Sequence, residues 1–161
     1  MVSPVPDGLS GIIPYLIVPD AKEAMAFYEK AFGAQQLMHM PGPGGQGTMH
    51  AEVKILGGTV MLSDENPQWE MVSAKTLGNS PISMMFYCEN VDEVFAQAVA
   101  AGCEVKFPIG DMFWGDRMGK VLDPFGYQWS IATHIEDIPD EEMPARQQKW
   151  LEEMASQAPP E

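Results

Sequence analysis

A pattern of apolar residues occurs twice in this chain, 67 positions apart, and it limits the folds that the chain can adopt. Spacings of three and one residues are typical of the apolar face of an amphipathic helix. Each copy ends at a glycine, Gly33 or Gly102, and glycine commonly terminates helices. The repeat therefore predicts two helices in equivalent positions of two similar modules. The first copy comprises Ala24, Phe27, Tyr28, Ala31 and Phe32, and the second comprises Val91, Val94, Phe95, Ala98 and Val99.

Strand-like segments surround each expected helix in the same order. A short apolar run precedes the helix, GIIPYLIVPD in the first copy and PISMMFYC in the second. A further strand-like segment and then a hairpin follow each helix, and the two hairpins turn around Gly57-Gly58 and around Pro124-Phe125-Gly126. We therefore predict an α+β fold of two βαβββ modules that form a cup-shaped mixed sheet, with a C-terminal helical tail.

The repeat also divides the chain into segments. Residues 65–81 carry Pro, Asn and Gly with weak periodicity, which is typical of a connecting loop. The last segment has acidic residues near its start and Lys149 later, a distribution that suits the dipole of a helix. The predicted parts are an N-terminal extension (1–10), a first βαβββ module (11–64), the connecting loop (65–81), a second βαβββ module (82–136), and an acidic C-terminal helix and tail (137–161).

Charge and hydropathy exclude several classes of partner. The chain has 9 Lys and Arg against 23 Asp and Glu, a formal net charge of −14, which would repel the phosphates of nucleic acid. No apolar run approaches the roughly 20 residues of a membrane span, and no secretory signal is visible. Cys88 and Cys103 are too few for a disulfide framework and are expected to be buried thiols. We expect a cytoplasmic protein that binds neither nucleic acid nor membrane.

The hairpin that begins at His50 is expected to have one polar face. Period-two alternation places His50, Glu52 and Lys54 on the same side of a strand. An imidazole and a carboxylate two positions apart could ligate a metal or act together as a base and its orienting group. The alternative is a solvent-facing strand with one hydrogen-bonded histidine, and two ligands are too few to define a metal site.

The final hairpin, FWGDRMGKVLDPFGYQWSIATH, contains more candidate residues. Trp114 offers a flat surface with one hydrogen-bond donor. Arg117 is suited to bidentate recognition of an anionic ligand, although Asp116 could equally hold it in a structural ion pair. Ser130 and His134 share one face of the last strand, and His134 could act as a general acid or base if this face lines a cup. An ordinary surface histidine is the alternative.

Three segments of the chain together resemble a known family. They are PYLIVPDAKEAMAFYEKAFGA, MHAEVKILGGTVMLSDE and the final hairpin. They resemble the vicinal-oxygen-chelate superfamily of glyoxalases, bleomycin-resistance proteins and dioxygenases, in its PhnB-like branch, and the resemblance covers residues 11–136. It implies paired βαβββ modules whose curved sheets enclose a cup, a homodimeric assembly, and the binding or transformation of a small molecule.

The resemblance also implies where a metal would bind. Metal-dependent members carry His or Glu at equivalent points of the first, fourth, fifth and eighth strands. In this chain those points fall at Ile13, Met61, Ser83 and Ser130, and the segment DPFGYQWS anchors the last of them. None of the four is a usual ligand of a divalent metal. We therefore expect no cofactor there, whereas Zn, Mn, Ni or Fe could bind only at a displaced site built from His50, Glu52 and His134.

Three functions remain open at this point. The first is a small-molecule-binding protein of the glyoxalase/bleomycin-resistance type without the usual metal site, whose ligand is anionic if Arg117 binds it. The second is an enzyme of lyase, isomerase or dioxygenase type that uses a divergent metal site, or His50 or His134 as an acid or base. The third, a structural or interaction module, is weaker because an Arg and two Trp in one short wall suggest a recessed site. The expected ligand-binding residues are His50, Trp114, Asp116, Arg117, Ser130 and His134.

Overall fold

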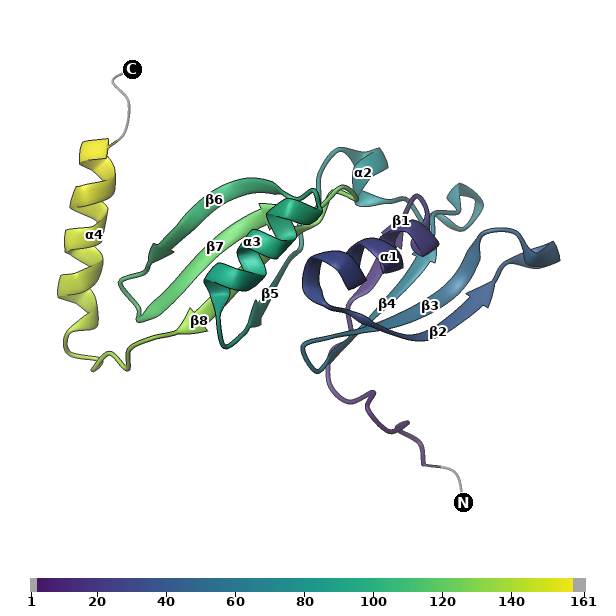
Figure 1. The fold of residues 1–161 in the computed structure, drawn as a ribbon, viewed down its shortest axis with the longest axis horizontal. Helices are drawn as coiled ribbons and strands as arrows, with labels where there is room; N and C mark the ends of the chain where they lie inside the picture. Colours follow the sequence, from purple (N-terminus) through teal and green to yellow (C-terminus); the bar gives the residue numbers. More distant parts are fainter. Residues whose placement is uncertain (1–2, 158–161) are drawn as a thin grey trace.

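The computed structural model describes residues 3–157, and its strands and helices follow the predicted order (Figure 1). The prediction of an α+β fold with two βαβββ modules and a C-terminal helix is confirmed. The first module comprises β1 (Tyr15–Val18), α1 (Ala21–Phe32), β2 (Gln35–Pro41), the 3-10 turn η1 (Pro43–Gly45), β3 (Thr48–Ile55) and β4 (Gly58–Asp64). The connecting segment holds η2 (Pro67–Trp69) and the short helix α2 (Ala74–Leu77). The second module comprises β5 (Ser83–Tyr87), α3 (Val91–Ala101), β6 (Glu104–Asp111), β7 (Asp116–Leu122) and β8 (Gln128–His134), and α4 (Met143–Gln157) follows it.

Capping residues fix the ends of the two module helices. The carboxylate of Asp20 accepts a hydrogen bond of 2.9 Å from the backbone N–H of Glu23, and the amide oxygen of Asn90 accepts one of 3.3 Å from that of Glu93. These bonds satisfy N–H groups that have no partner inside the helix. Gly33 ends α1 with φ of 66°, in the left-handed region that glycine adopts without strain.

The offset between the modules is 70 residues at the helix caps, Asp20 and Asn90, rather than the 67 that the apolar pattern indicates. A difference of three residues is almost one helical turn, so both offsets select nearly the same face of the helix. The three-residue error in the offset misplaces Val99, which was expected in the apolar face but is 38% exposed. At the structural offset Val99 corresponds to the exposed Glu29, which explains its position.

Within the described residues the strands form two four-stranded sheets with matching orders, β1-β4-β3-β2 and β5-β8-β7-β6. In each module the first strand pairs in parallel with the last, and the other pairs are antiparallel. β1 and β5 are therefore edge strands of their sheets. Pro14, immediately before β1, is tolerated there because its missing N–H interrupts no ladder inside a sheet.

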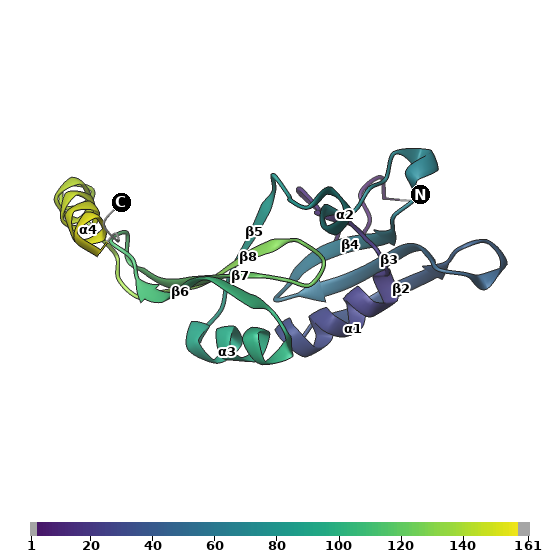
Figure 2. The same cartoon turned by 90° about the horizontal axis from the view of Figure 1, so that it is seen from above.

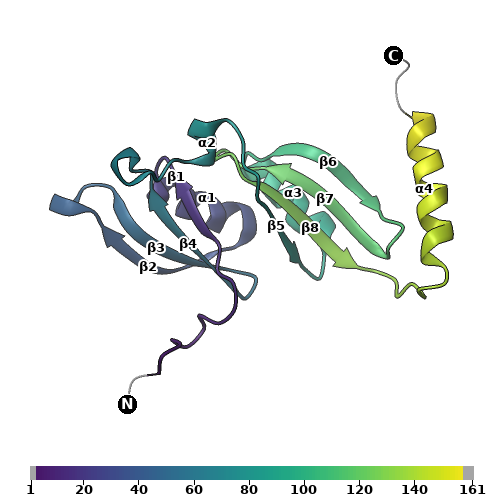
Figure 3. The same cartoon turned by 180° about the vertical axis from the view of Figure 1, so that it is seen from behind.

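Helices α1 and α3 cover the same side of both sheets and contact each other (Figure 2). Trp129 and Ile131 of β8 lie beneath them and are buried. Of the two free thiols, Cys103 is buried and Cys88 is half-buried. The opposite side of each sheet, which Figure 3 views from the front, carries neither α1 nor α3. We call these two surfaces the first and second open faces.

A buried carboxylate joins the two modules. Asp123, in the turn between β7 and β8, is 3% exposed, and its Oδ2 accepts hydrogen bonds from Tyr28 Oη on α1 (2.7 Å) and Trp129 Nε1 (2.8 Å). Its Oδ1 accepts from the backbone N–H groups of Phe125 and Tyr127, at 2.9 Å each. Burial raises the pKa of Asp123, and it raises the pKa of Tyr28 as well.

A tyrosine hydroxyl forms a second link between the modules. Tyr127 Oη accepts a hydrogen bond of 3.2 Å from the backbone N–H of Ile17 and donates one of 2.8 Å to the carbonyl oxygen of the same residue. Ile17 lies in the edge strand β1, whereas Tyr127 belongs to the second module. The hydroxyl therefore satisfies two backbone groups on the outer edge of the first sheet.

Helix α4 stands beside the second module, away from the first (Figure 1). Arg146 donates two hydrogen bonds to the carboxylate of Glu136, at 2.8 and 2.6 Å. The ring centroids of Trp150 and Phe113 are 5.6 Å apart. Leu151 on the same helix remains exposed. None of the helices in residues 3–157 combines the length and apolar character that crossing a bilayer requires.

Replacing Tyr28 by Phe tests the link through Asp123. The variant leaves a buried carboxylate oxygen without one of its donors, so we expect a loss of about 1 to 3 kcal/mol in the free energy of unfolding, measured by urea denaturation. Tyr15→Phe makes the same chemical change at a half-exposed residue and should stay within about 0.5 kcal/mol of the parent chain. Equal effects of the two substitutions would contradict the proposed link.

Candidate functional site

A groove with a volume of about 850 Å³ lies between the two modules in the described part of the chain. The edge strands β1 and β5, the segment around α2 and the turn before β4 form its walls. Its lining includes Ile13, Tyr15, Met85 and Tyr87, and the last three of these side chains are about half exposed. The groove therefore offers apolar contact together with two phenol hydroxyl groups.

A chain of hydrogen bonds crosses the first open face. Nδ1 of His50 lies 2.9 Å from the hydroxyl of Tyr15, and Nε2 of His50 lies 3.1 Å from Oε1 of Glu52. A carboxylate only accepts hydrogen bonds, so Nε2 carries the proton, and in the neutral ring Nδ1 accepts from the Tyr15 hydroxyl. His50 and Glu52 thus form the pair that the alternation of β3 predicts, and Tyr15 of β1 extends it to the groove.

A second polar cluster occupies the far end of the second open face. Asp116 is 3% exposed, and its Oδ2 accepts from Tyr87 Oη (2.7 Å) and Trp114 Nε1 (2.8 Å). Nδ1 of His134 lies 2.8 Å from Oδ1 of Asp116, and Nε2 of His134 lies 3.0 Å from a carboxylate oxygen of Asp137. Trp114, Asp116 and His134, three of the expected site residues, are therefore in contact.

The hydrogen bonds of this cluster shift the pKa of Asp116, Tyr87 and His134. Burial opposes ionisation of Asp116, but donors from His134, Tyr87 and Trp114 together lower its pKa. The bond to Asp116 raises the pKa of Tyr87, because removing the phenol proton would place a second negative charge beside the carboxylate. Bonds to Asp116 and then to Asp137 raise the pKa of His134.

Tyr15 and Tyr87 make similar contacts in the two modules, although Tyr15 begins β1 and Tyr87 ends β5. In each module the tyrosine pairs with a residue of the last strand, and that residue pairs in turn with a residue of the third strand. The residue two positions earlier on that third strand contacts the tyrosine hydroxyl. This residue is His50 in the first module and Asp116 in the second, so the two tyrosines contact different chemical groups.

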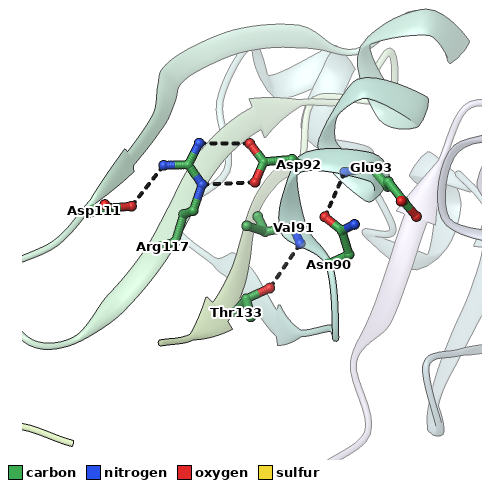
Figure 4. Close-up of polar contacts among 7 residues, drawn as sticks. All are labelled: Asn90, Val91, Asp92, Glu93, Asp111, Arg117 and Thr133. Carbon is green, nitrogen blue, oxygen red and sulfur yellow. Dashed lines mark hydrogen bonds and ion pairs between the residues drawn. The ribbon is translucent and has the colours of Figure 1, made fainter. Parts of the chain in front are cut away.

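Arg117 lies on the helix-covered side of the second sheet (Figure 4). Its Nε and Nη2 donate to the two carboxylate oxygens of Asp92 in the first turn of α3, at 2.9 and 2.8 Å, and Nη1 donates to Asp111 at 2.8 Å. These hydrogen bonds raise the pKa of Arg117 further above its usual range. The alternative in which Asp116 pairs with Arg117 is wrong, because neighbouring residues of a strand point to opposite faces.

The donor set at the superfamily's chelating positions does not fit a divalent metal. Ile13 precedes β1, Met61 is half-buried on β4, Ser83 begins β5 and Ser130 is buried on β8. None supplies an imidazole or a carboxylate. Among residues 3–157, no group of three or more His, Cys, Asp and Glu side chains is arranged to hold a metal ion, so His50, Glu52 and His134 are not gathered into one displaced site.

Sequence reasoning missed the two tyrosines that meet the groove. Alternation along PYLIV and SMMFYC would have placed Tyr15 and Tyr87 opposite the core, but their contact with His50 and Asp116 depends on strand pairing that a single sequence does not reveal. Sequence reasoning also missed Ser63 of β4, whose buried Oγ has no hydrogen-bond partner among the described residues.

Two βαβββ modules with helices on one side and open faces on the other define the class to which this protein belongs. The chain belongs to the Glyoxalase/Bleomycin resistance protein/Dioxygenase superfamily, whose family model matches residues 11–131. The match includes both modules up to the middle of β8, and it confirms the family that the sequence resembles.

Known proteins agree with this assignment. Mb0911c of Mycobacterium bovis, which is uncharacterized, is 39% identical over 135 residues, and the match covers 82% of this chain and 88% of the mycobacterial protein. TioX from Micromonospora sp. ML1 superposes with a TM-score of 0.61 and 24% identity, over 81% of this chain and 100% of TioX. The PhnB protein from Bacillus cereus superposes with a TM-score of 0.60 and 24% identity, over 77% of this chain and 99% of the Bacillus protein. The two structural likenesses establish the fold.

The contribution of His134 to stability should depend on pH. Its pKa is raised above 6.5, so the protonated ring stabilises the fold fully below pH 6.5, and this effect is lost as the pH rises through the raised pKa. The pKa of Asp116 is lowered below 3.8, so its effect is present above pH 3.8 and is lost as the pH falls through the lowered value.

We therefore expect His134→Gln to lower the melting temperature most between about pH 4 and pH 6, and least above about pH 8. Thermal unfolding followed by circular dichroism across this range measures the difference. His39→Gln is the matched control, because His39 contacts the hydroxyl of Thr48 at 3.0 Å rather than a carboxylate. A deficit for His134→Gln that is the same at every pH would contradict the role of the ion pair.

Proposed function

We propose that this chain binds a small organic molecule in the groove beside its open faces, without a divalent metal at the superfamily's chelating positions. The observation that carries the proposal is the identity of those positions, where Ile13, Met61, Ser83 and Ser130 replace the usual ligands. The groove keeps apolar walls and a few polar groups, the combination found in most small-molecule sites.

The polar contacts of the ligand come from the tyrosines. Tyr15 and Tyr87 line the groove directly, and each hydroxyl is held by a more enclosed residue, His50 or Asp116. His50 and Asp116 would therefore act on the ligand through the hydroxyl groups that they orient. In the same scheme Trp114 and His134 hold Asp116 in place from its other side.

The ligand is proposed to be uncharged or weakly acidic. Arg117, the expected contact for an anion, is already neutralised by Asp92 and Asp111 on the other side of the sheet. Lys54 and Lys120 lie on the open faces, but neither lines the groove, so they offer no direct contact for an anionic group there. The overall charge of −14 further disfavours a strongly anionic ligand.

An enzyme of lyase or isomerase type is the second candidate function. The hydrogen-bonded chain from Tyr15 through His50 to Glu52 favours it, because it links a base to an oriented carboxylate and ends at the groove. This version needs no metal ligand from the four chelating positions. The reaction would be an acid–base reaction at His50 and Tyr15, whereas His134 is held between two carboxylates.

We also propose that the chain forms a homodimer and has neither nucleic acid nor membrane as a partner. The open faces of the two modules expose large apolar side chains, including Tyr15, Met40, Met85 and Tyr87. Exposed apolar surface of this kind commonly marks an interface or a binding groove. A second copy would cover part of this surface and narrow the groove.

Metal content tests the first part of the proposal. Elemental mass spectrometry on untagged protein, purified without chelators and then incubated with Zn, Mn, Ni or Fe salts, should find well under about one metal ion per chain, because the chelating positions lack donors. Native mass spectra of the same sample should show the dimer. About one ion per chain that is lost in His50→Ala would instead establish the displaced metal site.

Ligand screening tests the second part. A library of small aromatic compounds, screened by ligand-observed NMR, should yield binders whose affinity falls by at least about tenfold in Met85→Arg, since the new charge would enter the apolar wall. Met85 is 50% exposed, so the variant should fold. Arg117→Gln is the control and should retain the affinity. Binding that survives Met85→Arg, or a library without binders, would contradict the proposed groove.

A further inference from the structure

The chain of hydrogen bonds on the first open face has a direction. Glu52 accepts from Nε2 of His50, and Nδ1 of His50 accepts from the hydroxyl of Tyr15. The side chains of His50 and Glu52 are 21% and 13% exposed, whereas Tyr15 is 45% exposed and lines the groove. The tyrosine oxygen is therefore the end of the chain that a bound molecule can touch.

We propose that Tyr15, His50 and Glu52 form a proton relay that accepts a proton from a weakly acidic hydroxyl group, a phenol or an enol, of a molecule in the groove. The proposal rests on the proposed function, because it requires that the groove binds a small molecule. It assigns the contact with the ligand to Tyr15, and the roles of base and orienting group to His50 and Glu52.

The transfer conserves atoms and charge. The O–H bond of the ligand breaks as its proton moves to the oxygen of Tyr15, while the original Tyr15 proton moves to Nδ1 of His50. The ligand becomes an anion and His50 becomes an imidazolium ion, which Glu52 stabilises through its carboxylate. Lys54, two positions further along the same face of β3, adds a second positive charge on that face.

Tyr87 of the second module is not expected to pass its proton to its neighbour. Its hydroxyl donates to Asp116, a carboxylate that already accepts from Trp114 and contacts His134. Loss of the Tyr87 proton would place two negative charges side by side, and the bond to Asp116 raises the pKa of Tyr87 accordingly. Loss of the Tyr15 proton to His50 instead creates a positive charge beside the new negative one.

The reactivity of the two tyrosines tests the proposal in one molecule. Benzenesulfonyl fluoride forms an aryl sulfonate ester when a phenol oxygen attacks its sulfur, fluoride leaves and the phenol proton passes to a base. Tyr15 and Tyr87 are similarly exposed, 45% and 53%, so access alone should not separate them. Peptide mapping by mass spectrometry should show that Tyr15 is modified about 100-fold faster, the lower range of assistance by a positioned base.

Variants of His50 separate its chemistry from its packing. In His50→Ala the rate at Tyr15 should fall to about that of Tyr87, and added imidazole should restore part of the Tyr15 rate while leaving Tyr87 unchanged. Glu52→Gln should slow Tyr15 by a smaller factor. Because Tyr87 reports on unfolding in the same sample, a variant that merely loosens the fold would raise both rates together.

Three results would overturn the relay: equal rates at Tyr15 and Tyr87 in the parent chain, a Tyr15 rate unchanged in His50→Ala, or no effect of imidazole on that variant. The labelling reaction needs no natural ligand, so its failure would leave the binding proposal standing. Conversely, failure of the ligand screen with selective labelling of Tyr15 would show that the relay exists without the proposed ligand class.

Discussion

The buried carboxylate of Asp123 holds the arrangement on which the open faces depend. It accepts hydrogen bonds from two backbone N–H groups of its own turn and from side chains of both modules, so removing it would leave several donors without partners. Tyr28 brings α1 of the first module to this turn of the second. Since α1 and α3 then share one side of the sheets, both open faces are directed to the other side.

The two modules share a backbone plan but differ in the side chains that face the groove. The residue that contacts the tyrosine hydroxyl is an imidazole, His50, in one module and a buried carboxylate, Asp116, in the other. In the proposed relay the neighbouring tyrosine releases its proton to form an ion pair, whereas in the second module the bond to Asp116 raises the pKa of Tyr87. Duplicated modules of this kind can thus divide the tasks of chemistry and structural support between two similar tyrosine contacts.

The fold could be predicted because it rests on periodic features that a single sequence displays. Apolar spacing identified α1 and α3, Gly33 marked the end of a helix, and alternation assigned His50 and Glu52 to one face. The site was harder to predict, because its contacts join residues far apart in the chain, such as Tyr15 and His50. The partner of Arg117 was missed for a different reason: alternation already separates it from Asp116, and only the packing of α3 reveals Asp92.

The hydroxyl of Tyr127 also bears on how other chains can approach. It occupies both the N–H and the carbonyl of Ile17 on the outer edge of β1, the groups that an added strand would need in order to extend the first sheet. Strand addition at this point would require Tyr127 to withdraw first. A second chain that meets this edge would therefore be recognised through side chains. The same hydrogen bonds protect the first sheet from edge-to-edge aggregation at this point.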